Sequence, residues 1–167
     1  MVRNADDVDQ YGLTSIPDLE KVGPGGQGVT VAGPAEFQNR DTGMKGMKEK
    51  YNLPAAGFLT VSSGAQYAAL DQNAANAADA FSTDYQLTSG KYTALKDPQG
   101  VFGYQYVAPV VKQDVLNQEG PEFAATLNWV SSLLSTKAIQ ALNQQVQGNK
   151  VDPASVAKQF LAANGLK

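Results

Sequence analysis

Short apolar runs alternate with amphipathic stretches along most of the chain. Runs rich in β-branched or aromatic residues that end at glycine, proline or aspartate predict strands. These runs cover residues 29–32, 57–61, 78–81, 92–95 and 107–111. Between them, apolar residues at helical spacing, such as Met44, Met47 and Tyr51, predict helices over about residues 41–51 and 62–70.

From Gly120 to the end the pattern is helical only. Apolar residues recur at helical spacing over 121–134, where a proline occupies the first helical position. Ser135 is a suitable N-cap for a second helix, and Asp152 for a third that stops at Gly165. The end of the chain is therefore expected to be a set of successive helices.

The order of these elements divides the chain into two parts. Alternating strands and helices predict an α/β lobe over residues 1–111, of which about the first 28 form a lead-in, followed by a helical segment over residues 112–167. The lobe is expected to contain a mostly parallel sheet flanked by helices. A glycine-rich run at 23–28 precedes a strand and lacks a following Gly-Lys-Ser/Thr, so a phosphate-binding loop is disfavoured.

Composition narrows the function classes. The chain has 167 residues, 43 % of them hydrophobic and 17 % charged, which is typical of a globular protein with a sizeable core. Its net charge is −3 without a basic stripe, so nucleic-acid binding is disfavoured. The absence of cysteine and histidine excludes disulfides, thiol nucleophiles, Cys/His zinc sites and Ser-His-Asp catalysis. We predict neither a metal site nor a cofactor.

Two features bear on membranes and export. The apolar runs, such as residues 107–111, are too short to span a bilayer. The first residues lack the apolar stretch of a signal peptide. We therefore expect neither a membrane span nor a signal peptide in this sequence.

Aromatic and neutral polar residues gather where strands end or begin. They occupy residues 36–41, 81–84 and 102–106. In open α/β sheets, ligands bind outside the carboxyl ends of the strands, where such segments meet. Aromatic faces attract quaternary ammonium groups, and an arginine binds a carboxylate through two parallel hydrogen bonds. The pattern suits a small zwitterion, although such rings also occur in cores and Arg40 beside Asp41 also suits a surface ion pair.

At these same segments the sequence resembles the substrate-binding proteins of ABC transporters for glycine betaine, choline, carnitine and proline betaine. The longer matching stretches are Glu36-Phe37-Gln38-Asn39-Arg40-Asp41-Thr42-Gly43, Ala80-Phe81-Ser82-Thr83-Asp84, Leu95-Lys96-Asp97 and Val107-Ala108-Pro109-Val110-Val111. Shorter ones are Tyr11-Gly12-Leu13, Ile16-Pro17-Asp18-Leu19, Lys50-Tyr51, Leu127-Asn128, Leu142-Asn143, and Val156-Ala157 through Phe160-Leu161 to Gly165-Leu166. Each stretch is weak alone, but together they follow the family's order across nearly the whole chain.

The resemblance implies a type II periplasmic-binding-protein fold, a clamshell of two α/β lobes with the ligand in the cleft. Members of the family have roughly one hundred further residues before the point that matches Val2, about the size of a lobe. The chain is therefore similar to the second lobe plus a C-terminal segment that returns to the first lobe.

The resemblance also assigns site residues. It implies that Arg40, in the Glu-Phe-x-x-Arg segment that contains Phe37, binds the ligand carboxylate. It implies that Phe81, two residues before Thr83, belongs to the aromatic cage around the ammonium group.

The third site segment departs from the family pattern. The family often has Phe-Pro-x-Tyr-Tyr before its Ala-Pro strand, with the first tyrosine in the cage, and here Gln105 takes that place. Either Tyr104 or Tyr106 supplies the ring through a shifted loop, or the ligand differs from betaine. The expected ligand-binding residues are Arg40, Phe37, Phe81, Thr83, Tyr104, Gln105 and Tyr106.

The implied function is that of an extracytoplasmic solute-binding component, which delivers a quaternary ammonium compound to an ABC permease in the membrane and is not an enzyme. Two alternatives stay open. One is a ligand-sensing domain of a regulator, which an upstream helix-turn-helix would indicate. The other is an enzyme in which Glu36 and Asp84 act as acid and base, which strongly shifted pKa values in a closed pocket would indicate. A lone lobe would also expose the apolar faces of its terminal helices, which predicts a homodimer.

Overall fold

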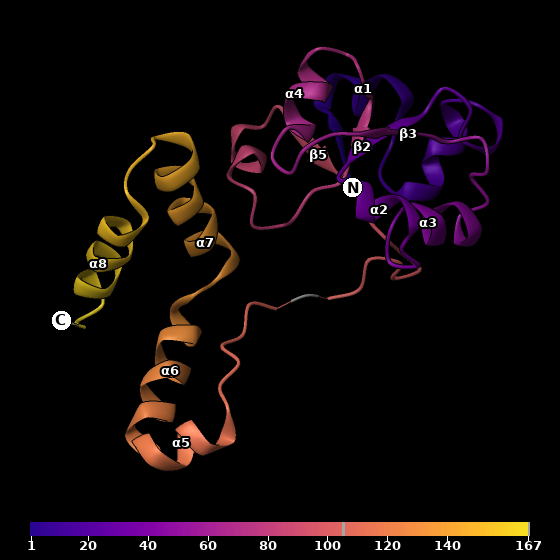
Figure 1. The fold of residues 1–167 in the computed structure, drawn as a ribbon. Coiled ribbons are helices and arrows are strands. Elements are labelled where there is room, and N and C mark those ends of the chain that lie inside the picture. The colour runs from indigo at the N-terminus through magenta and orange to yellow at the C-terminus, as the bar shows by residue number, and fades with distance from the viewer. Residues whose placement is uncertain (105, 167) are drawn as a thin grey trace. The chain divides into compact units, whose positions relative to one another are not determined.

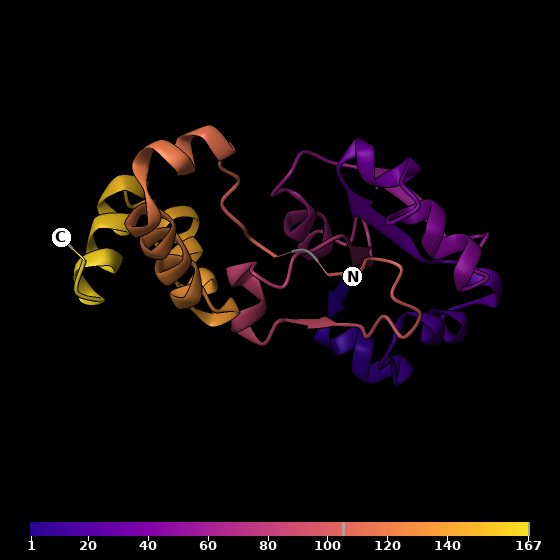
Figure 2. The same cartoon turned by 90° about the horizontal axis from the view of Figure 1, so that it is seen from below.

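The computed structural model describes residues 1–104 and 106–166. The chain forms two compact units, Met1–Gly103 and Tyr104–Lys167, and each is described by itself (Figure 1). The first unit contains a sheet with helices, and the second contains helices joined by short turns, as Figures 1 and 2 show.

The sheet of the first unit is mixed. Its strands are β1 (Val2–Asn4), β2 (Thr30–Gly33), β3 (Gly57–Thr60), β4 (Ala77–Ala78) and β5 (Tyr92–Ala94), in the order β3-β2-β4-β1-β5. β2 pairs in parallel with β3 and β4, whereas β1 is antiparallel to β4 and β5. Four of the five strands therefore run the same way, and the predicted α/β fold is confirmed.

Helices follow most of the strands. They are α1 (Ala5–Tyr11), η1 (Ile16–Lys21), η2 (Pro24–Gly26), α2 (Ala35–Asn39), α3 (Met44–Lys50), α4 (Gln66–Asp71) and η3 (Tyr85–Ser89). The helices predicted near residues 41–51 and 62–70 are confirmed as α3 and α4. The short α2, the turn η2 and the first strand were not predicted.

The strand predicted over residues 107–111 is wrong. That segment is extended chain in the second unit, without strand pairing in the described residues, and Val107 and Val110 are 66 % and 97 % exposed. Pro109 cannot donate a backbone hydrogen bond in its middle. An apolar segment forms a strand only where a neighbouring strand can pair with it. The local sequence does not show whether such a neighbour is present.

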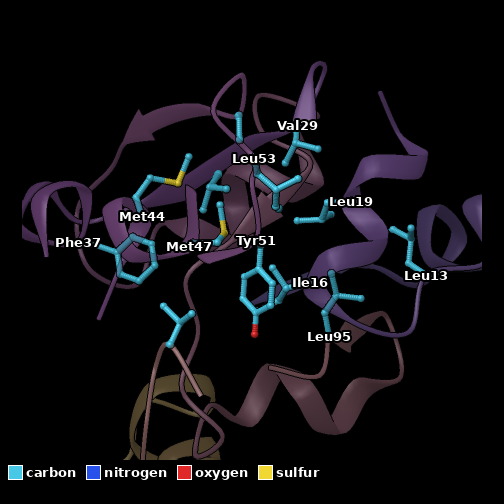
Figure 3. Packing of buried hydrophobic residues seen from close by; sticks show 14 of the residues in the cluster. Leu13, Ile16, Leu19, Val29, Phe37, Met44, Met47, Tyr51, Leu53 and Leu95 are labelled. Carbon is cyan, nitrogen blue, oxygen red and sulfur yellow. The ribbon is translucent and has the colours of Figure 1, made fainter. Parts of the chain in front are cut away.

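Two hydrophobic clusters lie on opposite faces of the sheet. Along β2, Val31 belongs to one cluster and Ala32 to the other, as the alternation of side chains in a strand requires. The first cluster contains Met44 and Met47 of α3 with Leu53 (Figure 3). The second contains Val2, Tyr67, Leu70 and Tyr92. Helices thus cover both faces of the sheet.

The first 28 residues, predicted as a lead-in, contribute to this core. Leu13, Ile16 and Leu19 are 3 %, 0 % and 0 % exposed. The glycine-rich run within them is a packing turn, because the Gly25 amide donates to the Glu20 carboxylate at 3.0 Å and Gly26 is buried beside Leu53. The Gly25 N–H is thus already bonded to the Glu20 carboxylate and is not available to a phosphate.

The second unit consists of α5 (Gln113–Glu119), α6 (Pro121–Leu133), α7 (Thr136–Asn143), the π-helical turn η4 (Gln144–Gly148) and α8 (Pro153–Ala163). Two predicted caps are confirmed: Ser135 accepts from the Ala138 amide at 3.2 Å, and Asp152 from the Ser155 amide at 2.9 Å. Among residues 104 and 106–166, only Val156 is buried. The helices of this unit therefore do not enclose a core of their own.

Three buried tyrosines predict a loss of stability at high pH. Tyr51, Tyr67 and Tyr92 donate their hydroxyls to Asp97, Asp84 and Asp71. Burial and the aspartate partners raise the pKa of Tyr51 to about 12, and burial with the neighbouring aspartate also raises the pKa values of Tyr67 and Tyr92. Tyrosines of an unfolded chain ionise near pH 10. As the pH rises above this value, the unfolded state therefore loses these protons before the folded state does.

We therefore expect the free energy of unfolding to change little below about pH 10 and to fall as the pH rises towards about 12, by up to ~1.4 kcal/mol per pH unit for each tyrosine. Urea unfolding at several pH values measures this slope. Tyr92→Phe is the control, since it should make the slope shallower. An unchanged slope in that variant would contradict the assignment.

Candidate functional site

The carboxyl ends of β2 and β4 lie side by side at one edge of the sheet. The two strands are parallel neighbours, with Val31 opposite Ala77 and Ala32 opposite Ala78. The Asp79 amide continues the pairing by donating to the Ala32 carbonyl at 2.8 Å. The segment after β2 carries Phe37 and Arg40, and the segment after β4 carries Phe81 and Thr83. The fold therefore brings two of the three predicted site segments to one edge.

Arg40 is an exposed and unpaired cation. It follows the last residue of α2, and its carbonyl accepts from the Gly43 amide at 3.0 Å, which closes a tight turn. Its neighbour Asp41 pairs with Lys45 at 2.7 Å, so the alternative of an Arg40–Asp41 ion pair does not hold. Within the described residues, the Arg40 guanidinium has no hydrogen bond or ion pair, and its charge acts on Asp79. It can therefore bind an external carboxylate.

Phe81 presents an aromatic ring at the same edge. The residue is 52 % exposed. Its amide donates to the Asp84 carboxylate at 3.0 Å, and its carbonyl accepts from the Asp84 amide at 3.0 Å. Thr83 lies half-buried within the turn that these two bonds close.

Phe37 lies beneath this edge in the core. It is 2 % exposed, and its ring stacks on Phe58 and on Phe102, with centroid distances of 6.2 and 5.9 Å. In the first unit the ring of Phe37 thus supports the segment that carries Arg40 and does not reach the surface.

Tyr104 and Tyr106 belong to the second unit, whereas Arg40 and Phe81 belong to the first. The two tyrosines are 91 % and 85 % exposed, and their rings stack at 6.4 Å with an interplanar angle of 8°. Gln105, the residue on the family's cage position, lies outside the described residues.

Asp97 anchors the segment that leads to these tyrosines. Its carboxylate accepts from Tyr51 Oη and from the amides of Val101 and Phe102 at 3.0 and 2.9 Å. Burial raises the pKa of Asp97, but these hydrogen bonds outweigh it and hold the pKa below its usual value. The end of the first unit at Gly103 is therefore fixed to α3 through Tyr51.

Sequence reasoning missed the role of two carboxylates at the edge. Asp79 is half-buried, and burial raises its pKa while the charge of Arg40 lowers it. Asp84, considered in the sequence as an acid–base candidate, accepts hydrogen bonds from the Phe81 amide at 3.0 Å and from Tyr67 Oη at 2.9 Å. In the sequence, Asp79 lies two residues before Phe81 and Asp84 three residues after it. This closeness was the signal that could have indicated their role. Two carboxylates thus lie at the edge, where Asp79 interacts with the N-terminal ammonium group and with Arg40. A carboxylate at this edge attracts the cationic group of a ligand.

Two further features of the described residues bear on function. The described residues contain no group of three acidic side chains placed to hold a metal ion. No helix in the described part of the chain is long and apolar enough to cross a membrane.

The comparison with known families matches residues 2–163 to OpuAC, the substrate binding domain of ABC-type glycine betaine transport systems. The chain belongs to this family. Its members are transport binding proteins and not enzymes, which removes the acid–base alternative for Glu36 and Asp84.

Individual relatives agree with this assignment. The chain is 28 % identical over 166 residues to the carnitine transport binding protein OpuCC of Listeria monocytogenes, covering 98 % of this chain and 52 % of that protein. It is 31 % identical over 160 residues to the glycine betaine-binding protein YehZ of Escherichia coli, covering 92 % of this chain and 52 % of that protein. The chain spans about half the length of these curated relatives.

Solved structures show the same fold. A crystal structure of a glycine betaine/carnitine/choline ABC transporter matches with a TM-score of 0.74 and 25 % identity, over 98 % of this chain and 59 % of that one. The apo structure of YehZ from Escherichia coli matches with a TM-score of 0.60 and 25 % identity, and the match covers 98 % of this chain and 60 % of that one. The predicted α/β fold of this chain therefore matches that of solved binding-protein structures.

Proposed function

We propose that this chain is part of the solute-binding component of an ABC importer, and that the edge with Arg40 and Phe81 binds a small quaternary ammonium solute. The observation that carries the proposal is an unpaired, exposed guanidinium and an exposed ring on two segments that follow neighbouring parallel strands. Glycine betaine, carnitine and choline are the candidate solutes, since the family and the relatives are described by the first two and a matching structure by all three.

The chemistry of the edge fits both ends of such a solute. Arg40 offers two parallel N–H donors to a carboxylate. The Phe81 face attracts the ammonium group, worth about 0.5–2 kcal/mol when water is excluded. Asp79 adds a negative charge beside Arg40 and so favours a positive group over a second carboxylate.

The remaining predicted residues complete the proposal. Thr83 contributes a hydroxyl in the Phe81 turn, and Tyr104, Gln105 or Tyr106 supplies a further contact from the segment after Gly103. Phe37 acts by supporting the edge, given its burial.

The proposed mechanism needs the half of the protein that the relatives have and this chain does not include. A ligand held between two lobes favours the closed state, because only there do both lobes contact it. The closed, extracytoplasmic protein would then deliver the solute to a membrane permease. This chain by itself is expected to bind weakly or not at all.

Arg40→Ala tests the carboxylate contact. In the full-length binding protein, the variant is expected to lower the affinity for glycine betaine roughly 10- to 100-fold, as for loss of a charged hydrogen bond. Choline has no carboxylate and should lose less. Isothermal titration calorimetry with both ligands measures the difference.

Lys50→Ala is the matched control for this test. It removes an exposed cation at the end of α3, keeps the Asp41–Lys45 ion pair in place, and should leave both affinities unchanged. Equal losses for betaine and choline in Arg40→Ala would refute the carboxylate role of Arg40.

A further inference from the structure

We propose that Asp84 and Tyr67 form a positioning pair that fixes the direction of the Phe81 ring at the ligand edge. This inference rests on the proposed function of Phe81 and deepens it. It concerns how an exposed ring keeps the orientation that an ammonium group needs.

The backbone of Phe81 is held on both sides by one residue. Its N–H donates to Asp84 Oδ2 at 3.0 Å, and its C=O accepts from the Asp84 amide at 3.0 Å. Hydrogen bonds to a carboxylate are stronger than bonds between neutral groups. The direction of the Phe81 Cα–Cβ bond is therefore set by a residue three positions later.

Tyr67 connects this turn to the core. Its hydroxyl donates to the same Oδ2 of Asp84 at 2.9 Å. The residue is 5 % exposed on α4, and its ring packs edge-on against Tyr92 at 4.9 Å. Because the Tyr67 ring is held by packing, its hydroxyl is a fixed donor that places the carboxylate of Asp84.

Packing alone does not orient Phe81. About half of its surface is exposed, at 52 %, whereas Phe37 at 2 % is enclosed by two stacked rings. A half-exposed ring depends on its backbone for its direction. The attraction of a cation to a ring depends on the cation lying over the ring face, so a turned ring loses this contribution.

The experiment compares Tyr67→Phe, Phe81→Ala and the double variant in the full-length binding protein. Tyr67→Phe removes one oxygen and keeps the packed ring. We expect it to lower the affinity for choline about three- to tenfold, in the direction of Phe81→Ala. In the Phe81→Ala background it should have almost no effect, because there is no ring left to position.

Tyr92→Phe is the matched control. It removes a hydroxyl from the neighbouring ring of the same cluster, where Tyr92 donates to Asp71 at 2.6 Å, and should not change the affinity. Independent effects of Tyr67→Phe and Phe81→Ala, or an equal loss in Tyr92→Phe, would overturn the positioning role.

Amide hydrogen exchange separates this inference from the proposed function. Without any ligand, Tyr67→Phe should speed exchange of the Phe81 amide relative to wild type and to Tyr92→Phe. Unchanged exchange overturns the positioning pair. An affinity that Phe81→Ala leaves unchanged overturns the ligand role of Phe81, even where exchange shows that the turn is held as described.

Discussion

Replacing Gly46 with alanine is expected to destabilise the first unit by about 3 kcal/mol, at the upper end of the usual cost of overpacking. The same substitution inside a helix normally stabilises it by about 1 kcal/mol. The sign is reversed because a Cβ on Gly46 would lie 1.8 Å from the Asp41 carbonyl oxygen and 3.3 Å from Val101 Cγ1. The first of these is a backbone atom of the turn that carries Arg40, so the turn itself must move.

Urea unfolding of Gly46→Ala and Gly12→Ala measures this effect. Gly12 has a φ of +58° and open space around its missing Cβ, so alanine there costs only the left-handed backbone, about 1 kcal/mol. If Gly46→Ala were as stable as Gly12→Ala, α3 would not approach the turn as closely as described. The glycine thus places Arg40 by letting a helix pack directly against its turn.

Strong periodic signals led to correct elements. Met44, Met47 and Tyr51 predicted one face of a helix, and they are 2 %, 0 % and 7 % exposed. Gly46 lies between them, but a glycine in a helical pattern indicates only a weak helix former. Its contact with the Asp41 carbonyl depends on the position of another segment, and periodicity does not contain that information.

The missed first strand shows a different limit. β1 has three residues and includes Arg3, which is 1 % exposed. Arginine is seldom buried without a partner. Here Asp7 accepts from Arg3 at 3.2 Å, and the Tyr11 ring lies 5.8 Å from the guanidinium carbon. Only Nη2 of the guanidinium is paired, while Nε and Nη1 are buried without a hydrogen-bond partner among the described residues. A short polar stretch does not predict such burial.

The candidate site was predictable in part. The resemblance to the family assigned Arg40 and Phe81, and both lie on segments that follow strands. Parallel pairing of β2 and β4 then brings those strand ends together. The bond from Tyr67 to Asp84 joins residues 17 positions apart on different elements. No rule of sequence spacing predicts this hydrogen bond. The proposed support of the Phe81 ring therefore follows from the structure and not from the sequence.

The 167-residue chain on its own is expected to self-associate through its second unit. The apolar faces that a lone lobe was expected to expose are only half-buried; they carry Phe123, Leu127, Val130, Ile139, Leu142, Phe160 and Leu161. Val115 and Trp129 are 39 % and 42 % exposed. Soluble monomers rarely expose apolar patches beyond a few hundred Å², and covering such area is favourable by about 25 cal/mol per Å².

Sedimentation velocity over about a hundredfold range of concentration measures the association. Trp129 lines a shallow groove on α6 with Pro121 and Ala125, and buried tryptophans often dominate interfaces. Trp129→Ala should therefore weaken association by about tenfold or more. Phe81→Ala removes a more exposed ring from the first unit and should leave the association unchanged. A chain that stays monomeric at every concentration would show that these helices cover one another, and the apolar faces would then need no partner in the rest of the binding protein.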